Sequence, residues 1–390
     1  MTQALIVGGG IGGLTTALWF HRVGVAVTVF EAVPEVKPLG VGINLLPHST
    51  KVLHQLGLQN RLEATAILTR ELRYHSKDGK TIWVEPRGRF AGYQTPQYSI
   101  HRGRLQMLLL DAVKNTIGAQ QVLTDHRFVG CEQSETCGVV AHFARSQAGE
   151  EQVSVRGDVL IGADGLHSAV RALFYPHEGP PQFSGRMLWR GAVETEPFLG
   201  GDTMVMMGTN DLKAVIYPIS QESAVRGRSL VNWVAERRIG KDNPRAKESW
   251  NKQGHKADFV SYFHNWRFSW IDVPKLFTET DEVFEFPMVD RDPVAQWSTN
   301  AVRAPVVKCT PVSRKPNSKR SLKHTSAWPD SIVRQSTADA AVGYQVAIQN
   351  GLNFADTQLA IGDSAQETVS LVHLSTSNRS VVVLHVYLAG

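Results

Sequence analysis

The sequence predicts an α/β protein in which a β-rich domain is inserted into a parallel-sheet domain, with an aberrant segment at the C-terminal end. Three observations predict this class. A strand, a glycine turn and a helix open the chain, strand patterns dominate residues 183–290, and the composition changes near residue 300. A length of 390 residues suits two connected domains that share a sizeable core.

The first part of the chain has the pattern of alternating strands and helices. Residues 4–7 (ALIV) form a short apolar run before the glycines, and residues 26–32 (AVTVFEA) predict the next strand. Helices are expected at residues 47–57 and from Arg102 onward, where apolar residues recur at helical spacing. Residues 69–100 alternate around the turn KDGK, so we expect a hairpin that contributes to the inserted domain.

A second set of elements leads into the β-rich domain. Residues 139–157 alternate as strands, and residues 158–165 (DVLIGADG) predict a buried strand that continues into a turn and a helix. Later strand candidates are GRMLWRGAVE, AVIYPIS and SLVNWVAE. The expected domains are therefore a dinucleotide-binding domain at 1–180, a β-rich domain at 181–290 and a divergent region at 291–390.

Composition excludes several classes of protein. The chain is 42% hydrophobic and 20% charged, and no apolar run reaches the roughly 18 residues of a membrane span or has the basic start of a secretory leader. Its three cysteines form no CxxC pair and its histidines lack metal-ligand spacing, so we expect no metal site and a cytoplasmic location. The net charge of +5 gives no indication of nucleic-acid binding, and the sequence leaves the oligomeric state open.

Gly8, Gly10 and Gly13 form the pattern GxGxxG between the first strand and the first helix. The first glycine permits a tight turn, the second lets the backbone approach a pyrophosphate, and the third lets the helix pack on the strand. The phosphate then lies at the helix N-terminus, where unpaired N–H groups favour an anion. Glu31 follows 21 residues after Gly10, at the end of the second strand, where it can accept a hydrogen bond from a ribose hydroxyl. These features predict a site for the ADP part of NAD or FAD.

A second turn favours FAD over NAD. The segment DVLIGADGLHSAVR repeats the order of strand, turn and helix, with Asp164 and Gly165 at the turn, while GxGxxG occurs once. This segment resembles the DG motif of the class A flavoprotein monooxygenases, the flavin-dependent aromatic hydroxylases. In that family a single nucleotide fold holds FAD, and the DG segment lies near FAD and the nicotinamide cofactor. The resemblance implies a Rossmann-like FAD-binding domain.

The resemblance covers about residues 1–300 and is strongest to the phenazine-carboxylate monooxygenases of this family. It is carried by VKPLGVGINLLPHSTKVLHQLGL, YSIHRGRLQMLL, MLWRGAVE, SLVNWV and FPMVDRDPVAQW. It implies that Arg102 contacts FAD, that Gly42 lies in the loop along the flavin, and that Arg190 and Tyr217 lie on the active-site side. The residues alone also allow Arg190 to be an ion-pairing arginine of a sheet and Tyr217 to be a core aromatic.

The resemblance also implies a reaction. It is the hydroxylation of an aromatic or heteroaromatic carboxylic acid with O₂ and NADH or NADPH, through a C4a-hydroperoxyflavin whose distal oxygen is electrophilic. The protein then orients the substrate, excludes water and protects the peroxide from collapse to H₂O₂. The partners expected are thus a small aromatic substrate, O₂ and the reduced nicotinamide, with no nucleic acid and no membrane.

The chain departs from the family at about residue 300. The second FAD motif, GDAAH followed by PxxGxG, is replaced by a basic, Ser- and Pro-rich run, and the faint GDSA at Gly362–Ala365 comes some 55 residues late. Such a change is what a shifted reading frame or a misjudged splice site produces. We therefore expect weak FAD binding and poor order at residues 301–335. Two alternatives stay open: an inactive, FAD-deficient relative, and a flavin-dependent dehydrogenase or NADH oxidase.

Overall fold

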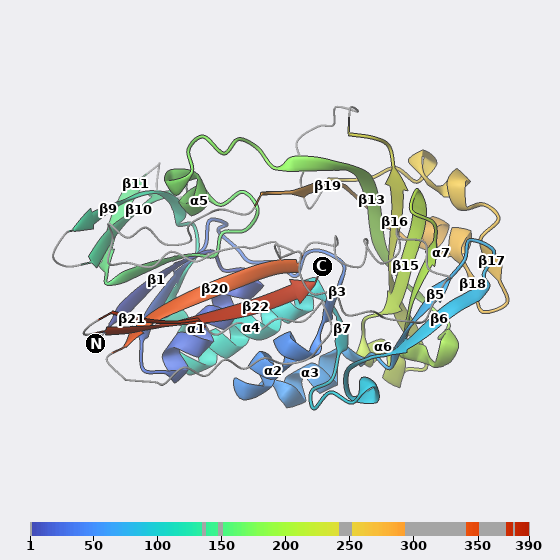
Figure 1. Cartoon of the computed structure of the whole chain (residues 1–390), viewed down its shortest axis with the longest axis horizontal. Helices are drawn as coiled ribbons and strands as arrows, with labels where there is room; N and C mark the ends of the chain where they lie inside the picture. The colour runs from blue at the N-terminus through green and yellow to red at the C-terminus, as the bar shows by residue number, and fades with distance from the viewer. Residues whose placement is uncertain are drawn as a thin grey trace, which may run out of the picture.

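The computed structural model contains a parallel-sheet domain and a large antiparallel-rich sheet that lie side by side (Figure 1). The structure describes residues 2–134, 138–146, 151–241, 252–292, 341–350, 372–376 and 379–389. The two parts meet at the start of β3 (Gly42–Leu45), where Gly42 donates a hydrogen bond to Asn232 of the large sheet. The candidate site lies at this junction.

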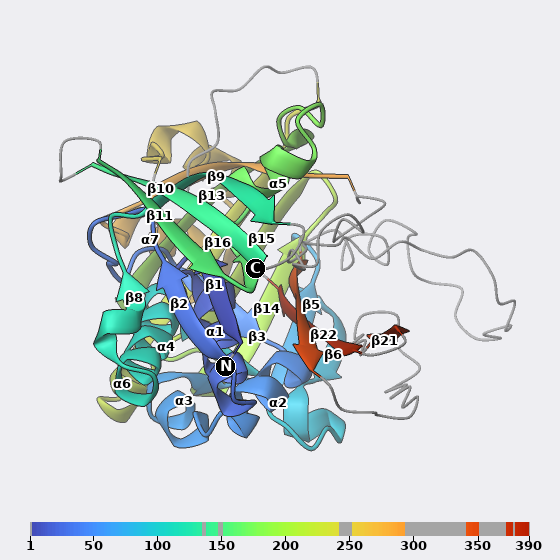
Figure 2. The ribbon, with the colours of Figure 1, turned by 90° about the vertical axis from the view of Figure 1, so that its left-hand side faces the viewer.

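The parallel sheet has the strand order β12-β1-β2-β8. Its strands are β1 (Gln3–Val7), β2 (Ala26–Phe30), β8 (Val122–Leu123) and β12 (Val159–Gly162), and the helices α1 (Ile11–Arg22) and α4 (Arg102–Thr116) cover one face (Figure 2). Residues of β1 are buried on both faces: Ile6 packs with the helices, whereas Leu5 packs against Phe143 of the meander β9 to β11. This two-sided burial explains why ALIV is a continuous apolar run rather than an alternating one.

The meander and a short helix cover the other face of the parallel sheet. The meander consists of β9 (Arg127–Ser134), β10 (Gly138–Arg145) and β11 (Glu151–Gly157), and the helix α5 (Ala169–Phe174) follows β12. Phe143 stacks on Phe30 with ring centroids 4.1 Å apart. The expected strands and the short helix after the DG turn are confirmed.

The second sheet has seven strands in the order β19-β13-β16-β15-β14-β5-β6. They are β5 (Glu71–His75), β6 (Thr81–Pro86), β13 (Gln182–Thr195), β14 (Thr203–Gly208), β15 (Leu212–Pro218), β16 (Ser229–Arg238) and β19 (Phe284–Asp290). The N-terminal hairpin β5–β6 joins this sheet because β5 pairs in parallel with β14. One face is closed by α7 (Val273–Glu279) and aromatic side chains such as Trp233 and Phe277.

A third sheet lies between these two. It contains β3 (Gly42–Leu45), β4 (Ile67–Leu68) and β7 (Tyr98–His101), with β20 (Ala341–Asn350) and β22 (Arg379–Ala389) at its other side. The strand β21 (Val372–Thr376) pairs with β22. The helices α2 (Pro47–Gln55) and α3 (Gln59–Thr65) follow β3.

The main differences from the expected elements are additional helices and strands. The helix expected at 47–57 ends earlier and is followed by α3, because Gly57 adopts a φ of +79° that ends the first helix. The helices α6 (Gln221–Val225) and α7 and the strand β14 were not predicted individually. The expectations for residues 301–335 and for Gly362–Ala365 fall outside the described residues.

The described residues contain neither a candidate membrane span nor a candidate metal site. None of its helices is long and apolar enough to cross a membrane. Within the same residues, no group of three or more His, Cys, Asp or Glu side chains is arranged to hold a metal ion.

Candidate active site

The glycine turn brings three elements together and leaves space above a helix N-terminus. Gly8 has a φ of +108°, and a Cβ there would lie 2.4 Å from the carbonyl oxygen of Ala163 on the neighbouring strand end. A Cβ on Gly13 would lie 1.9 Å from the oxygen of Gly8, so helix and strand are in direct backbone contact. Around a Cβ on Gly10, by contrast, no atom of the described residues lies within 4 Å. Gly10 therefore leaves room for an anion at the start of α1.

Glu31 is tied to this turn directly. Its Oε2 accepts a hydrogen bond of 2.7 Å from the N–H of Gly9, and its Oε1 accepts one of 3.0 Å from the N–H of Val33. A carboxylate offers about four acceptor positions, so two remain for hydroxyl donors. The side chain is thus held next to the glycine turn, and its role toward a ribose stays a prediction.

The first turn of α4 connects the glycine turn to β3. The side-chain amide of Gln106 donates to the carbonyl oxygen of Gly9 at 3.0 Å, and the N–H of Arg102 donates to the oxygen of Val41 at 2.7 Å. The side chain of Arg102 passes Gly40, where an added Cβ would lie 3.7 Å from its Cδ. A ligand that extends from the glycine turn along this helix start therefore reaches the beginning of β3.

Gly42, the first residue of β3, meets the seven-stranded sheet. Its N–H donates a 2.7 Å hydrogen bond to Oδ1 of Asn232 on β16. An added Cβ would lie 2.7 Å from both Asn232 and the ring of Tyr217. Because Tyr217 on β15 is directly opposite Asn232 in the sheet, both side chains project from the face that β3 approaches. We call this face the substrate face.

One row of the substrate face runs across four strands. Arg190 of β13 is opposite Val234 of β16, which is opposite Val215 of β15, which is opposite Met206 of β14. These four side chains are all partly buried, in contrast to the fully buried residues of the other face. The row therefore offers an apolar surface with a guanidinium at one end.

The charges at this end follow from burial. Burial of its guanidinium and, to a smaller extent, the charge of Arg102 lower the pKa of Arg190 to about 10. Burial raises the pKa of Tyr217 well above its usual value. At neutral pH Arg190 is thus a cation and Tyr217 a neutral phenol. The guanidinium also lies 5.1 Å from the ring centroid of Phe286.

The DG turn lies beside Gly8, and the hydrogen bonds of its aspartate are made with the start of α5, the helix that follows the turn. Oδ2 of Asp164 accepts hydrogen bonds from the N–H groups of Ala169 and Val170 at 2.7 and 3.2 Å, and Oδ1 accepts one of 2.5 Å from the hydroxyl of Ser168. Burial outweighs these bonds and raises the pKa of Asp164. Gly165 has a φ of +80°. The role of both residues toward a cofactor stays a prediction.

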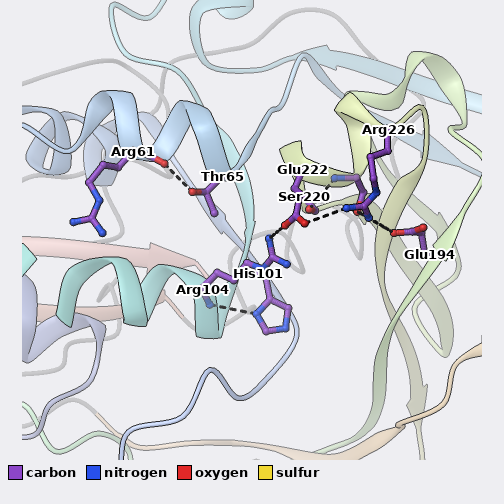
Figure 3. A network of polar contacts seen from close by, with 9 residues as sticks. Arg61, Thr65, His101, Arg104, Glu194, Ser220, Glu222 and Arg226 are labelled. Atoms are coloured by element: carbon purple, nitrogen blue, oxygen red, sulfur yellow. Dashed lines mark hydrogen bonds and ion pairs between the residues drawn. The ribbon is translucent and has the colours of Figure 1, made fainter. Parts of the chain in front are cut away.

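Two polar clusters hold the two parts together, and sequence reasoning missed both. Arg104 of α4 contacts Glu222 of α6 at 2.8 Å, and Arg226 bridges Glu222 to Glu194 of β13 (Figure 3). These pairs are exposed, so each contributes little stability. The second cluster joins Arg291, after β19, to the segment beyond α5.

In that second cluster the side chain of Arg291 donates to Oε2 of Glu178 at 3.0 Å and to the carbonyl oxygen of Leu166 at 2.9 Å. Arg171 of α5 contacts the same carboxylate, and these cations lower the pKa of Glu178. The two arginines are visible in the sequence segments VDRDP and SAVR, but no sequence pattern indicates that they contact the same carboxylate. Asn232 and Gln106 were missed for the same reason, since their partners lie far away in the sequence.

Comparisons with known proteins show the family of this chain. Residues 1–280 match the family model described as FAD binding domain. The chain belongs to this family. It is 43% identical over 298 residues to phenazine 1,6-dicarboxylic acid hydroxylase of Lysobacter antibioticus, covering 76% of this chain and 73% of that protein. It is 30% identical to 3-hydroxybenzoate 6-hydroxylase of Polaromonas naphthalenivorans, with 76% and 70% covered.

The fold is shared with solved structures. A structure of HpxO from Klebsiella pneumoniae with FAD and uric acid superposes with a TM-score of 0.62 at 24% identity, covering 78% of this chain and 72% of that one. The described residues fit the ADP end of FAD, because Gly10 leaves open space at the start of α1 and Glu31 is fixed beside it. The second FAD motif has no counterpart in the sequence directly after β19.

The variants Gly10→Val and Glu31→Ala test the cofactor end of this site. Valine would occupy the open space at the turn, and loss of the charged acceptor should weaken FAD by about 1.5 to 3 kcal/mol. Titration with FAD, followed by flavin fluorescence, measures both effects. Glu35→Ala is the matched control because this exposed carboxylate of the same loop contacts only Lys37 among the described residues. Unchanged affinity in both test variants would contradict the assignment.

Proposed function

We propose that this chain is an FAD-dependent monooxygenase that hydroxylates an aromatic or heteroaromatic carboxylic acid with O₂ and NADH or NADPH. The observation that carries the proposal is the row from Arg190 to Met206, which begins next to the position where Gly42 meets the sheet. An apolar row with one partly buried cation is suited to an aromatic ring that bears a carboxylate.

The dimensions of the row support a range of ring sizes. Neighbouring strands lie about 4.8 Å apart, so the three steps from Arg190 to Met206 span about 14 Å. This length accommodates a fused-ring acid as well as a single ring. Relatives with names that specify a phenazine dicarboxylic acid and a hydroxybenzoate support the same substrate class.

Bound FAD supplies the oxygen chemistry, and the residues of the chain bind and orient the reactants. Gly10 and Glu31 would hold the ADP end, and the segment from Arg102 to Gly42 leads toward the substrate face. Arg190 would bind the substrate carboxylate, while the neutral Tyr217 presents a hydroxyl rather than a second charge. The aliphatic row excludes water from one side of the ring, which favours transfer of oxygen to the substrate.

The relatives favour oxygen transfer over the two alternatives. Those named above are hydroxylases, which argues against a dehydrogenase or NADH oxidase. The FAD-deficient alternative depends on the missing second motif, and the amount of flavin that the purified chain carries tests it. The need for reduced nicotinamide and the cysteine pattern support a cytoplasmic location.

Arg190→Ala should uncouple the reaction. With saturating added FAD, the ratio of hydroxylated product to NAD(P)H consumed should fall at least about tenfold, because a charged hydrogen bond to the substrate is lost. The thermal midpoint should change little, since the side chain of Arg190 is only partly buried. Arg237→Ala is the control: this arginine of β16 contacts Tyr262 instead. Hydroxylation by Arg190→Ala at the wild-type rate and coupling would refute the role.

The purified chain should carry far less than one FAD per chain. The glycine turn holds the ADP end only, and the family's second motif, which holds the ribityl chain and the flavin, is absent from the sequence. An isoalloxazine that is not fixed loses the advantage of orientation and is open to water. The measurement is the flavin absorbance of the purified protein against its concentration. Stoichiometric FAD with tightly coupled hydroxylation would show that residues 336–390 rebuild the site.

A further inference from the structure

Asn232 is a buried asparagine whose side-chain oxygen is hydrogen-bonded, whereas its side-chain nitrogen has no partner among the described residues. Its side chain is fully buried on the substrate face of β16, and Oδ1 accepts the hydrogen bond from Gly42. Its Nδ2 has no hydrogen-bond partner among the residues that the structure describes. The bond to Gly42 also fixes which end is oxygen, because a backbone N–H needs an acceptor.

This arrangement costs stability. A buried donor without a partner is unfavourable, and an apolar side chain of the same shape avoids that penalty. The neighbours of Asn232 on the core face of the strand, Val231 and Trp233, are apolar or fully hydrogen-bonded. Packing therefore does not explain an asparagine at this position. The specific interaction of this side chain is the hydrogen bond that its oxygen accepts from Gly42.

The hydrogen bond to Gly42 connects the two ends of the proposed site. Gly42 is 190 residues away in the sequence and begins β3, which follows the segment beside Arg102. A larger residue would not fit at this position, because an added Cβ would lie 2.7 Å from both Asn232 and Tyr217, and the hydrogen bond holds the backbone of Gly42 next to them. Asn232 thus sets the distance between the cofactor-side strand and the substrate face.

We propose that Asn232 is a positioning residue that holds the Gly42 segment where the flavin end of FAD meets the substrate face. This inference rests on the proposed function. The side chain acts through the backbone of Gly42, so its removal changes the binding and surroundings of the flavin without weakening the fold.

The test compares Asn232→Leu and Asn232→Asp with the wild-type chain. Leucine has a similar shape, removes the unpaired Nδ2 and leaves the N–H of Gly42 without its acceptor. The two effects on stability offset each other, so the thermal midpoint should change little while FAD affinity falls about tenfold. Aspartate keeps an oxygen for the N–H of Gly42 and should restore the affinity to within about threefold of wild type. Added FAD is the probe, followed by flavin fluorescence and by the visible spectrum of the bound flavin.

Ser229→Ala is the matched control. This serine lies on the same strand, is buried and has a hydroxyl that is unpaired within the described residues, but it is not in contact with Gly42. Its removal should leave FAD affinity and the flavin spectrum unchanged. A change of affinity in this control equal to that of Asn232→Leu would overturn the inference, because any buried polar group of β16 would then have the same effect.

Three further outcomes would overturn the proposal. Asn232→Leu could bind FAD with wild-type affinity and spectrum, which would leave the proposed function intact. It could lose affinity and thermal stability together without rescue by aspartate, which would show a structural role only. A wild-type chain that binds no FAD at any concentration would contradict the proposed function, and the inference would fall with it.

Discussion

The close contact between Gly42 and the Asn232–Tyr217 pair is the constraint on which the arrangement of the two sheets depends. A side chain at residue 42 would overlap both partners at 2.7 Å, so the contact requires glycine for space alone. Through this contact β3 lies against β15 and β16, and the start of α4 is joined to the residue before β3 by the hydrogen bond from Arg102 to Val41. The glycine turn and the substrate face, which lie in different sheets, are therefore connected through Gly42 and the start of α4, as the proposed function requires.

The residues that build this site divide into packing and binding groups. Gly8 and Gly13 allow backbone contact between strand and helix, which leaves Gly10 and Glu31 to define an open space. On the opposite side, Arg190 keeps its charge despite burial, and a row of partly buried apolar side chains extends from it. The exposed network around Arg104 adds a second, salt-sensitive connection between the parts (Figure 3).

Sequence reasoning found the features that depend on short-range order. The glycine turn, Glu31 and the DG turn were predictable because strand, turn and helix follow one another within a few residues. Arg190 and Tyr217 were singled out by resemblance alone, since a strand residue does not reveal which face it occupies until its neighbours are known. Asn232 and Gln106 could not be predicted, because their functions depend on contacts across 190 and 97 residues.

The central claim is that one continuous path leads from the glycine turn, along the start of α4, to Gly42. Hydrogen–deuterium exchange of the chain with saturating ADP or saturating FAD tests it directly. We expect ADP to protect residues 8–14 and 31–33 only, and FAD to protect residues 38–45 and 102–106 in addition. Identical protection by the two ligands, or added protection elsewhere with none at residues 38–45, would contradict the account.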